Sequence, residues 1–176
     1  LEEETGYRVE KLEPMGYRDE TLPARMLRYR SDIWEATLTT NKSTPPIRQV
    51  VVFFNEKHDN GVHRLRDNWD YGRLDYDYAV IRVWEEPRQA VIDARLYGLY
   101  PLLPLMKGRE QETEKQALQE SVSAVQAVPD EALRLDLLAV MAIVAGDRYP
   151  LDLVLSMIRR EMIMESPIFQ EWIREE

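Results

Sequence analysis

Cysteine is absent from this chain of 176 residues, and histidine occurs only at His58 and His63. The lack of cysteine excludes disulfide bonds, thiolate zinc sites and a cysteine nucleophile, and two histidines in one polar segment argue against a histidine-rich metal site. No apolar run approaches the roughly 20 residues that a membrane-spanning helix needs, and the acidic start, Leu1 to Glu4, does not resemble a signal peptide. We therefore expect a cytoplasmic protein that makes no contact with a membrane.

The common motifs for nucleotide binding and hydrolysis are absent as well. The sequence contains no P-loop, G-x-G-x-x-G, G-x-S-x-G or H-E-x-x-H, so we expect no small-molecule cofactor. The net charge of −9 opposes a general nucleic-acid coat protein, because neutralisation of phosphates dominates non-specific affinity. The cations nevertheless gather near the front of the chain, at Arg25, Arg28, Arg30, Lys42 and Arg48. This uneven distribution indicates a side that faces a polyanion, or ordinary solvated faces of either sign.

The first half of the chain has the pattern of an α/β domain. Residues 7–13 alternate in part, which predicts a short edge strand that Pro14 and Gly16 stop. Pro23 opens a helix that ends around residues 38–41. The apolar run 49–54 predicts a strand buried on both faces, and residues 76–84 predict a second strand. The long polar segment 55–71, with its Asn60-Gly61 turn signal, is expected to be a loop.

The second half is helical. Residues 96–106 are apolar but broken by two prolines, and residues 110–128 are amphipathic with a strongly charged face. Asp130 is a suitable N-cap for a helix that ends at Gly146, and Pro150 opens another that continues to about Met164. We expect an α/β domain over residues 1–95 and a helical segment over residues 96–176 that packs on it. Because the chain starts at Leu1, we expect the first domain to be incomplete at its N-terminus.

Five stretches carry a resemblance to a known family. They are Ala24-Arg-Met-Leu-Arg-Tyr-Arg30, Val50-Val-Val-Phe-Phe54, Tyr78-Ala-Val-Ile-Arg-Val-Trp-Glu85, Leu96-Tyr-Gly-Leu-Tyr-Pro-Leu-Leu-Pro-Leu-Met-Lys-Gly108, and the part that runs from Asp136-Leu-Leu-Ala-Val140 to Arg159-Arg-Glu-Met-Ile-Met-Glu-Ser166. Together they resemble the recombination-promoting nuclease family, a transposase-type family in the PD-(D/E)XK nuclease-like superfamily, over roughly residues 20–174. The resemblance implies a restriction-endonuclease-like mixed sheet flanked by helices and a role in DNA recombination.

The resemblance also implies a catalytic position. Family members carry Glu-x-Gln upstream of the first helix, where carboxylates hold Mg²⁺ and the metal activates the attacking water. The segment 19–23 matches the link that follows this motif, so counting back puts Glu13 at the Glu position and Met15 at the Gln position. Glu13 is thus the candidate catalytic residue and Mg²⁺ ligand, but Met15 cannot hold a water by a strong hydrogen bond. A second acid would come from Glu2, Glu3 or Glu4, so we expect a degraded or truncated hydrolytic site.

Contacts to nucleic acid have two candidate locations. The resemblance implies that Arg25, Arg28 and Tyr29 contact phosphates, and the alternative is a solvated helix face on which arginine stems cover apolar surface. The long loop carries cations and aromatic residues that could grip a single strand, but interleaved aspartates cancel their field, so a plain solvated loop is the alternative. These aspartates also lack the order of an EF-hand calcium loop. The cations of the loop are Lys57, His58, Arg64 and Arg66, the aromatic residues that could act with them are Trp69, Tyr71 and Tyr76, and the interleaved aspartates are Asp59, Asp67, Asp70, Asp75 and Asp77.

Two function classes remain open from the sequence. The first is a DNA-transaction protein resembling a metal-dependent endonuclease, impaired in catalysis and with DNA as its partner. The second is a non-catalytic protein-interaction module on a nuclease-like scaffold. The apolar positions of residues 133–164 are expected to form helix–helix core, with a homodimer through the C-terminal helices as the alternative.

Overall fold

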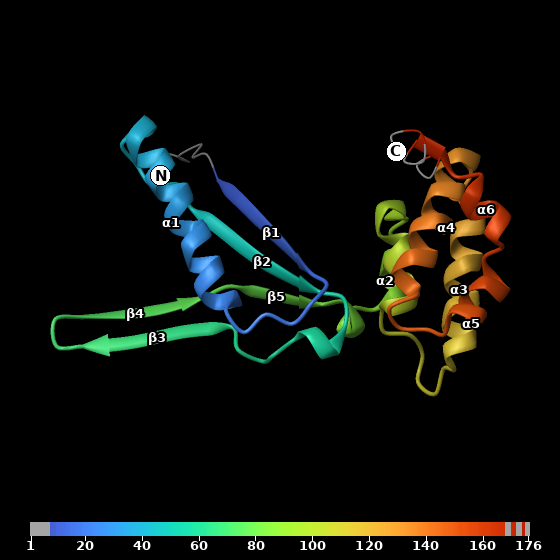
Figure 1. The fold of residues 1–176 in the computed structure, drawn as a ribbon, viewed down its shortest axis with the longest axis horizontal. Coiled ribbons are helices and arrows are strands. Elements are labelled where there is room, and N and C mark those ends of the chain that lie inside the picture. The colour runs from blue at the N-terminus through green and yellow to red at the C-terminus, as the bar shows by residue number, and fades with distance from the viewer. Residues whose placement is uncertain (1–7, 168–169, 172–173, 175–176) are drawn as a thin grey trace. The chain divides into compact units, whose positions relative to one another are not determined.

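The computed structural model describes residues 8–167, 170–171 and 174, which form a mixed α/β architecture (Figure 1). The chain divides into two compact units, residues 1–82 and 83–176. The first contains a small parallel sheet and an antiparallel hairpin, and the second is helical. The division that the sequence suggests, after residue 95, falls within the second unit.

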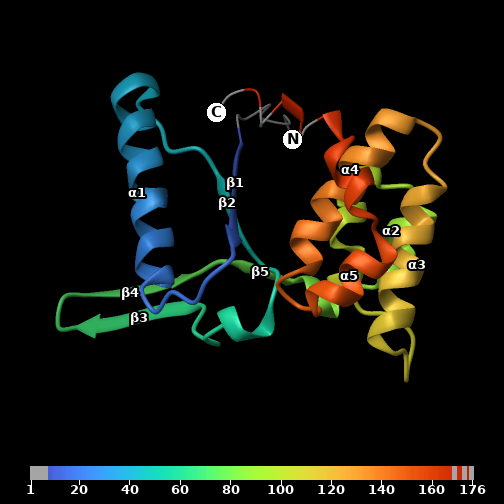
Figure 2. The ribbon, with the colours of Figure 1, turned by 45° about the vertical axis from the view of Figure 1, so that its right-hand side comes forward.

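The first unit is built on a strand–helix–strand arrangement. Strand β1 (Val9–Met15) leads through helix α1 (Leu22–Asn41) to β2 (Ile47–Phe53), and β2 pairs with β5 (Ala79–Arg82) on its other side. All three strands are parallel, with Val9 opposite Ile47 and Val50 opposite Ala79. Parallel neighbours need a crossover connection, and the 20-residue α1 supplies it between β1 and β2. α1 lies along one face of the sheet (Figure 2).

Alternate residues of the sheet point toward α1 and form the core of this unit. Met15, Val51 and Phe53 are almost fully buried, as are Leu22 and Met26 of the helix. Gln49 is a buried polar residue on this face, and its side-chain amide is hydrogen-bonded at both ends. The Gln49 side chain donates from Nε2 to the Met26 carbonyl at 2.7 Å and accepts from the Tyr76 hydroxyl at 2.9 Å. A buried amide with both ends bonded avoids the desolvation cost of an unpaired group.

The prediction that Pro14 ends the first strand is wrong, because β1 continues through Pro14 to Met15. The Val9 N–H donates to the Pro46 carbonyl at 3.0 Å, so the odd-numbered residues of β1 are those that bond to β2. The nitrogen of Pro14 therefore lies on the outer side of an edge strand. There its missing N–H removes no bond from the ladder, which is the position in a sheet that tolerates proline.

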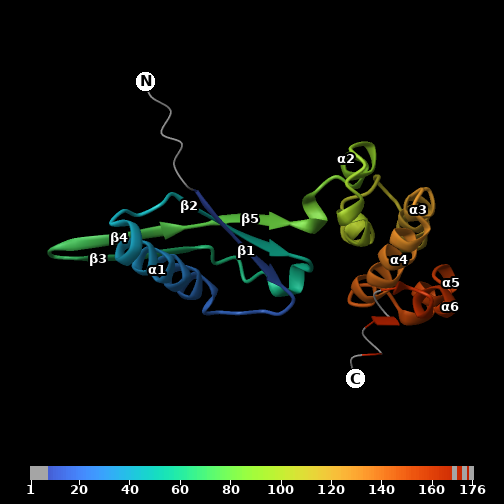
Figure 3. The same ribbon diagram turned by 90° about the horizontal axis from the view of Figure 1, so that it is seen from above.

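The prediction of a long loop at residues 55–71 is also partly wrong. Residues 56–58 form a 3₁₀ turn (Glu56–His58), and β3 (Arg64–Trp69) pairs with β4 (Gly72–Asp77) in an antiparallel hairpin closed by a two-residue turn. The strand predicted at residues 76–84 is divided at Tyr78 into the end of β4 and the whole of β5. Figures 1 and 3 show the hairpin extending past the parallel strands.

The second unit consists of short helices around an apolar core. They are η2 (Val83–Glu85), α2 (Arg88–Asp93), η3 (Tyr97–Leu105), α3 (Glu114–Gln126), α4 (Glu131–Ala145), α5 (Leu151–Met157) and α6 (Arg160–Met164). Leu103, Leu118, Val125, Leu138 and Met141 are fully buried among them.

Several helix ends follow the sequence signals. Thr113 and Gln116 form a reciprocal capping box at the start of α3, and the Asp130 carboxylate accepts from the Leu133 N–H at 2.9 Å at the start of α4. The single helix predicted over residues 150–164 is wrong, because Ile158 and Arg159 are extended and separate α5 from α6. None of the helices in the described part of the chain is long and apolar enough to cross a membrane.

Candidate functional site

The carboxyl ends of the three parallel strands are the first place to look for a site in this fold. In open α/β sheets, ligands bind in the loops beyond these ends. Here Met15, Phe53 and Arg82 close the strands. Residues 16–21 and 54–63 form the connections that follow the first two, and two clusters of charged side chains lie among them.

Glu13 is held by cations. Its side chain is 14% exposed, and its carboxylate lies 2.7 Å from Lys11 Nζ and 3.3 Å from Arg25 Nη2. β1 presents Lys11, Glu13 and Met15 on the face that α1 covers, which is why a helix residue reaches the Glu13 carboxylate. Both carboxylate oxygens therefore take part in ion pairs within the protein.

Arg25 is the centre of this first cluster. Beside Glu13 it contacts Asp19 Oδ2 at 3.2 Å, donates from Nη1 to the Tyr17 hydroxyl at 2.7 Å, and lies 3.3 Å from the Met15 sulfur. Its Nε is buried with no hydrogen-bond partner among the described residues. The guanidinium faces inward, so it is poorly placed for a phosphate in solution.

Asp19 is fixed by the turn that begins α1. The Thr21 hydroxyl and backbone N–H both donate to Asp19 Oδ1 at 2.7 Å. The hydrogen bond from the Thr21 hydroxyl has the largest effect and lowers the pKa of Asp19. Burial opposes it, and the Thr21 backbone N–H and the charge of Arg25 lower the pKa further. The carboxylate therefore stays ionised and keeps Arg25 in place.

Arg28 and Tyr29 lie on α1 outside this cluster. Arg28 is exposed, with its guanidinium 5.5 Å from the centre of the Tyr29 ring, and Lys11 Nζ lies 4.9 Å from the same ring. The structure thus brings two cations close to the Tyr29 ring, whereas Arg25 is held apart by its ion pairs. We call Lys11, Arg28 and Tyr29 the Tyr29 patch.

A second cluster, which sequence reasoning missed, follows β2 and ends β5. Asp59 Oδ2 accepts from Arg82 Nε at 2.7 Å, and Asp59 Oδ1 lies 2.9 Å from His63 Nε2. Burial alone would raise the pKa of Asp59, but the Gly61 N–H, Arg82 and His63 together lower it. The sequence shows Asp59 and His63 four residues apart and Arg82 at the end of a strand. Only the parallel pairing of β2 and β5 brings Arg82 to the other two.

A divalent metal does not fit the described residues. No group of three or more histidine and acidic side chains in the described ranges is arranged to hold one. Mg²⁺ prefers a near-octahedral shell of oxygen atoms, whereas Glu13 is engaged by two cations and the nearby Met15 offers a soft sulfur. Glu2, Glu3 and Glu4, the expected sources of a second acid, lie outside the described residues.

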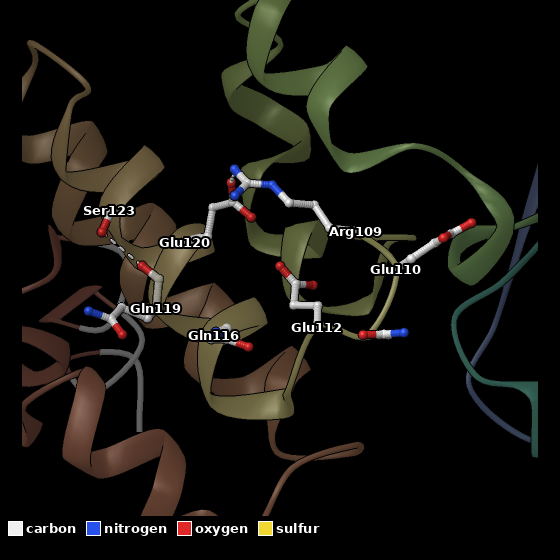
Figure 4. A pocket seen from close by; sticks show the side chains of 8 residues that line it. Arg109, Glu110, Glu112, Gln116, Gln119, Glu120 and Ser123 are labelled. Atoms are coloured by element: carbon white, nitrogen blue, oxygen red, sulfur yellow. Dashed lines mark hydrogen bonds and ion pairs between the residues drawn. The ribbon is translucent and has the colours of Figure 1, made fainter.

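The second unit carries a polar cleft of about 430 Å³ beside the start of α3. In Figure 4, Arg109 reaches to Glu120 (2.7 Å), Glu112 lies close to that pair, and Glu110 points away. A neighbouring cleft of about 450 Å³ shares Arg109 and Glu120 and is also lined by Arg88. The Arg109–Glu120 ion pair thus lines both clefts.

Arg88 is the buried member of this network, with its side chain only 2% exposed. It donates to the Ala117 carbonyl at 2.8 Å, forms an ion pair with Glu112 and lies 3.4 Å from Glu120. A buried guanidinium with this many acceptors has its hydrogen-bonding needs met within the fold. Arg88 therefore offers no unpaired charge to a ligand in either cleft.

No protein-family model matches the chain, and neither a curated protein nor a solved structure matches it significantly.

Proposed function

We propose that this chain is a DNA-transaction protein on a restriction-endonuclease-like scaffold, in which the Glu13 position serves as an ion-pair residue and hydrolysis is lost. The observation that carries the proposal is the pair of cations on the Glu13 carboxylate, at 2.7 Å and 3.3 Å. The resemblance to recombination-promoting nucleases supports the DNA role, and it rests on stretches outside the catalytic position.

The chemistry of the Glu13 surroundings supports the loss of hydrolysis. A metal at Glu13 would have to compete with Lys11 and Arg25, whose charges already neutralise the carboxylate. Met15 follows two residues later and cannot orient a water by a strong hydrogen bond. A bound Mg²⁺ would polarise a phosphate and activate water, but the described residues give it no shell of ligands.

The Tyr29 patch is the proposed point of contact with nucleic acid. Arg28 is exposed and offers a phosphate contact, and the Tyr29 ring beside it helps to hold the guanidinium in place. Phosphate contacts of this kind position a protein without reading sequence. The net charge of −9 opposes the association, so we expect weak binding that depends strongly on salt.

Cleavage of supercoiled plasmid with Mg²⁺ or Mn²⁺ tests the loss of hydrolysis. The wild-type chain and Glu13→Ala, each with and without EDTA, should nick the plasmid at the same background rate. Metal-dependent nicking that Glu13→Ala abolishes would refute the ion-pair assignment and establish a nuclease.

DNA binding by fluorescence anisotropy at low salt tests the contact surface. Arg28→Ala should weaken binding several-fold and reduce the salt dependence by about one phosphate contact. Arg48→Ala is the matched control, because Arg48 is also exposed but lies on the face of the sheet away from α1. Equal losses in both variants would mean that only total charge matters, and no binding by any variant would refute the DNA role.

A second candidate, a non-catalytic protein-interaction module, is favoured by exposed apolar side chains on the C-terminal helices. Ile143 on α4 is 64% exposed and Leu151 on α5 is 65% exposed. Such side chains suit a homodimer contact. Sedimentation velocity should then show a dimer that Ile143→Glu dissociates, and a monomer at all concentrations would remove this candidate.

A further inference from the structure

Asn60 ties together the two loops at the carboxyl ends of β1 and β2. Its Nδ2 donates to the Asp19 carbonyl at 3.0 Å and lies 3.3 Å from Glu20 Oε2, across 41 and 40 residues of sequence. Its Oδ1 accepts from the Val62 N–H at 2.9 Å. Both ends of the carboxamide are thus hydrogen-bonded. The Nδ2 end links residues 54–63 to the connection that precedes α1.

The residue after Asn60 is a glycine in the left-handed region, with φ +74°. Glycine adopts this conformation at little cost and has no side chain to shield its nitrogen. The Gly61 N–H donates to Asp59 Oδ1 at 2.8 Å. Asn60-Gly61 therefore combines a side-chain amide with an unshielded neighbouring backbone nitrogen, which is the pair of groups that reacts in spontaneous deamidation.

In this reaction the Gly61 nitrogen loses its proton and attacks Cγ of Asn60. The new N–Cγ bond closes a five-membered succinimide, the Cγ–Nδ2 bond breaks, and the amide nitrogen leaves as ammonia after taking up a proton. Water then opens either carbonyl of the ring and yields aspartate or isoaspartate. Solvent water is the only co-reactant, and no electrons are transferred.

The folded loop opposes each part of this step. The attacking nitrogen is engaged with Asp59, whose carboxylate is itself bonded to Arg82 and His63. Asp59 is a poor proton acceptor, because its pKa lies below the ordinary value. The leaving nitrogen is bonded to the Asp19 carbonyl, and the attacked carbonyl is fixed by Val62. Reaction requires opening of the loop, as in other local unfolding reactions.

We propose that Asn60-Gly61 is a latent deamidation site that the native loop keeps closed, and that its conversion breaks the Asn60 link between residues 54–63 and the β1–α1 connection. A carboxylate at position 60 has no hydrogen to donate to the Asp19 carbonyl. It would also face the Glu20 carboxylate, which replaces an attraction with a repulsion. The isoaspartate product adds a backbone atom and displaces Gly61 from its bond to Asp59. Conversion is irreversible, so the link would not re-form.

The rate of conversion tests the latent site. The full chain is incubated at mildly alkaline pH, native or in urea, and peptide mapping measures aspartate plus isoaspartate at position 60. Native conversion should be slower than in urea by at least about tenfold, since it waits for the loop to open. Asn68, on the exposed hairpin and followed by Trp69, is the internal control and should convert slowly in both. Equal rates at position 60 in both conditions would overturn the protection, and no conversion in urea would overturn the site.

Hydrogen exchange tests the consequence of conversion. Asn60→Asp mimics the product, and Asn68→Asp adds the same charge on the hairpin as the matched control. Asn60→Asp should raise exchange in residues 16–21 and 54–63, and the control should leave these segments unchanged. Unchanged exchange in Asn60→Asp would refute the role of the link, and an equal rise in both variants would assign the effect to charge alone.

Discussion

Gly108 lies where a side chain would collide with the buried ion pair of the second unit. A Cβ at this position would overlap both Glu112 Oε2 and Arg88 Nη2. Gly108 does not have a positive φ, so the requirement for glycine comes from space and not from backbone conformation. Replacement by alanine therefore tests the ion pair without removing either charged residue.

The expected cost is that of overpacking. The added Cβ would meet the ends of two side chains that can shift, and Arg88 keeps Glu120 and the Ala117 carbonyl as partners, so its charge is not left uncompensated. Overpacking of a well-packed site costs about 1–3 kcal/mol. Alanine also restricts the unfolded chain, which returns about 0.4–1 kcal/mol. We expect Gly108→Ala to lower the free energy of unfolding by about 1–2 kcal/mol.

Urea unfolding followed by far-UV circular dichroism measures this change. With a slope of about 1–3 kcal/mol/M, the midpoint should fall by about 0.5–1 M. Gly98→Ala is the matched control, because nothing lies within 4 Å of its added Cβ and its φ is not positive. The double change Gly108→Ala with Glu112→Asp should recover part of the loss, since the shorter acid withdraws its oxygen. A Gly108→Ala midpoint equal to that of Gly98→Ala would refute the steric argument.

Three further perturbations follow from caps and titrating groups. Thr113→Ala removes the capping box of α3 and should cost about 1 kcal/mol in urea unfolding; no change would mean that the cap is not needed. Burial raises the pKa of Tyr76 to about 12, so stability present below pH 10 should be lost between pH 10 and 12, by about 2–3 kcal/mol for this group. Tyr76→Phe should flatten that limb, and an unchanged alkaline profile would contradict the assignment. The pKa of Asp59 lies below its ordinary value of 3.8, so its ionised carboxylate stabilises the fold above pH 3.8, and this stability is lost as the pH falls below that value. Asp59→Asn should therefore reduce the acid sensitivity of thermal unfolding; the same acid profile in both chains would contradict this.

The parts of the fold that depend on local sequence were predictable. The apolar run at 49–54 indicated a buried strand, and β2 occupies it as the central strand of the sheet. Asp130 and Gly146 bound α4 as expected, because caps act through backbone groups one turn away. Pro23 similarly lies in the first turn of α1.

The errors came from features that depend on pairing between distant segments. The residues of β3 are polar apart from Leu65 and Trp69, a pattern that predicts a loop. Pairing with β4 makes them a strand. Pro14 predicts the end of a strand, and only the position of β1 at the edge of the sheet explains why the strand continues through it.

The candidate site divides in the same way. Glu13 and Arg25 were identified separately, but their ion pair depends on the packing of α1 over β1. The Asp59–His63–Arg82 cluster requires the parallel pairing of β2 and β5. The roles assigned to Glu13, Arg28 and Tyr29 remain predictions for the assays above.

Pro14 also has a consequence for contacts between molecules. The outer side of β1 offers donors at Glu10 and Leu12, and the series is interrupted at Pro14, which has no N–H. A strand from another molecule that added along this edge would lose a hydrogen bond there and meet the proline ring. The opposite edge strand, β5, is only four residues long. Short edges and edge prolines are the means by which sheets avoid open-ended growth into fibrils, so Pro14 lets a sheet this small keep an exposed edge without becoming a template for aggregation.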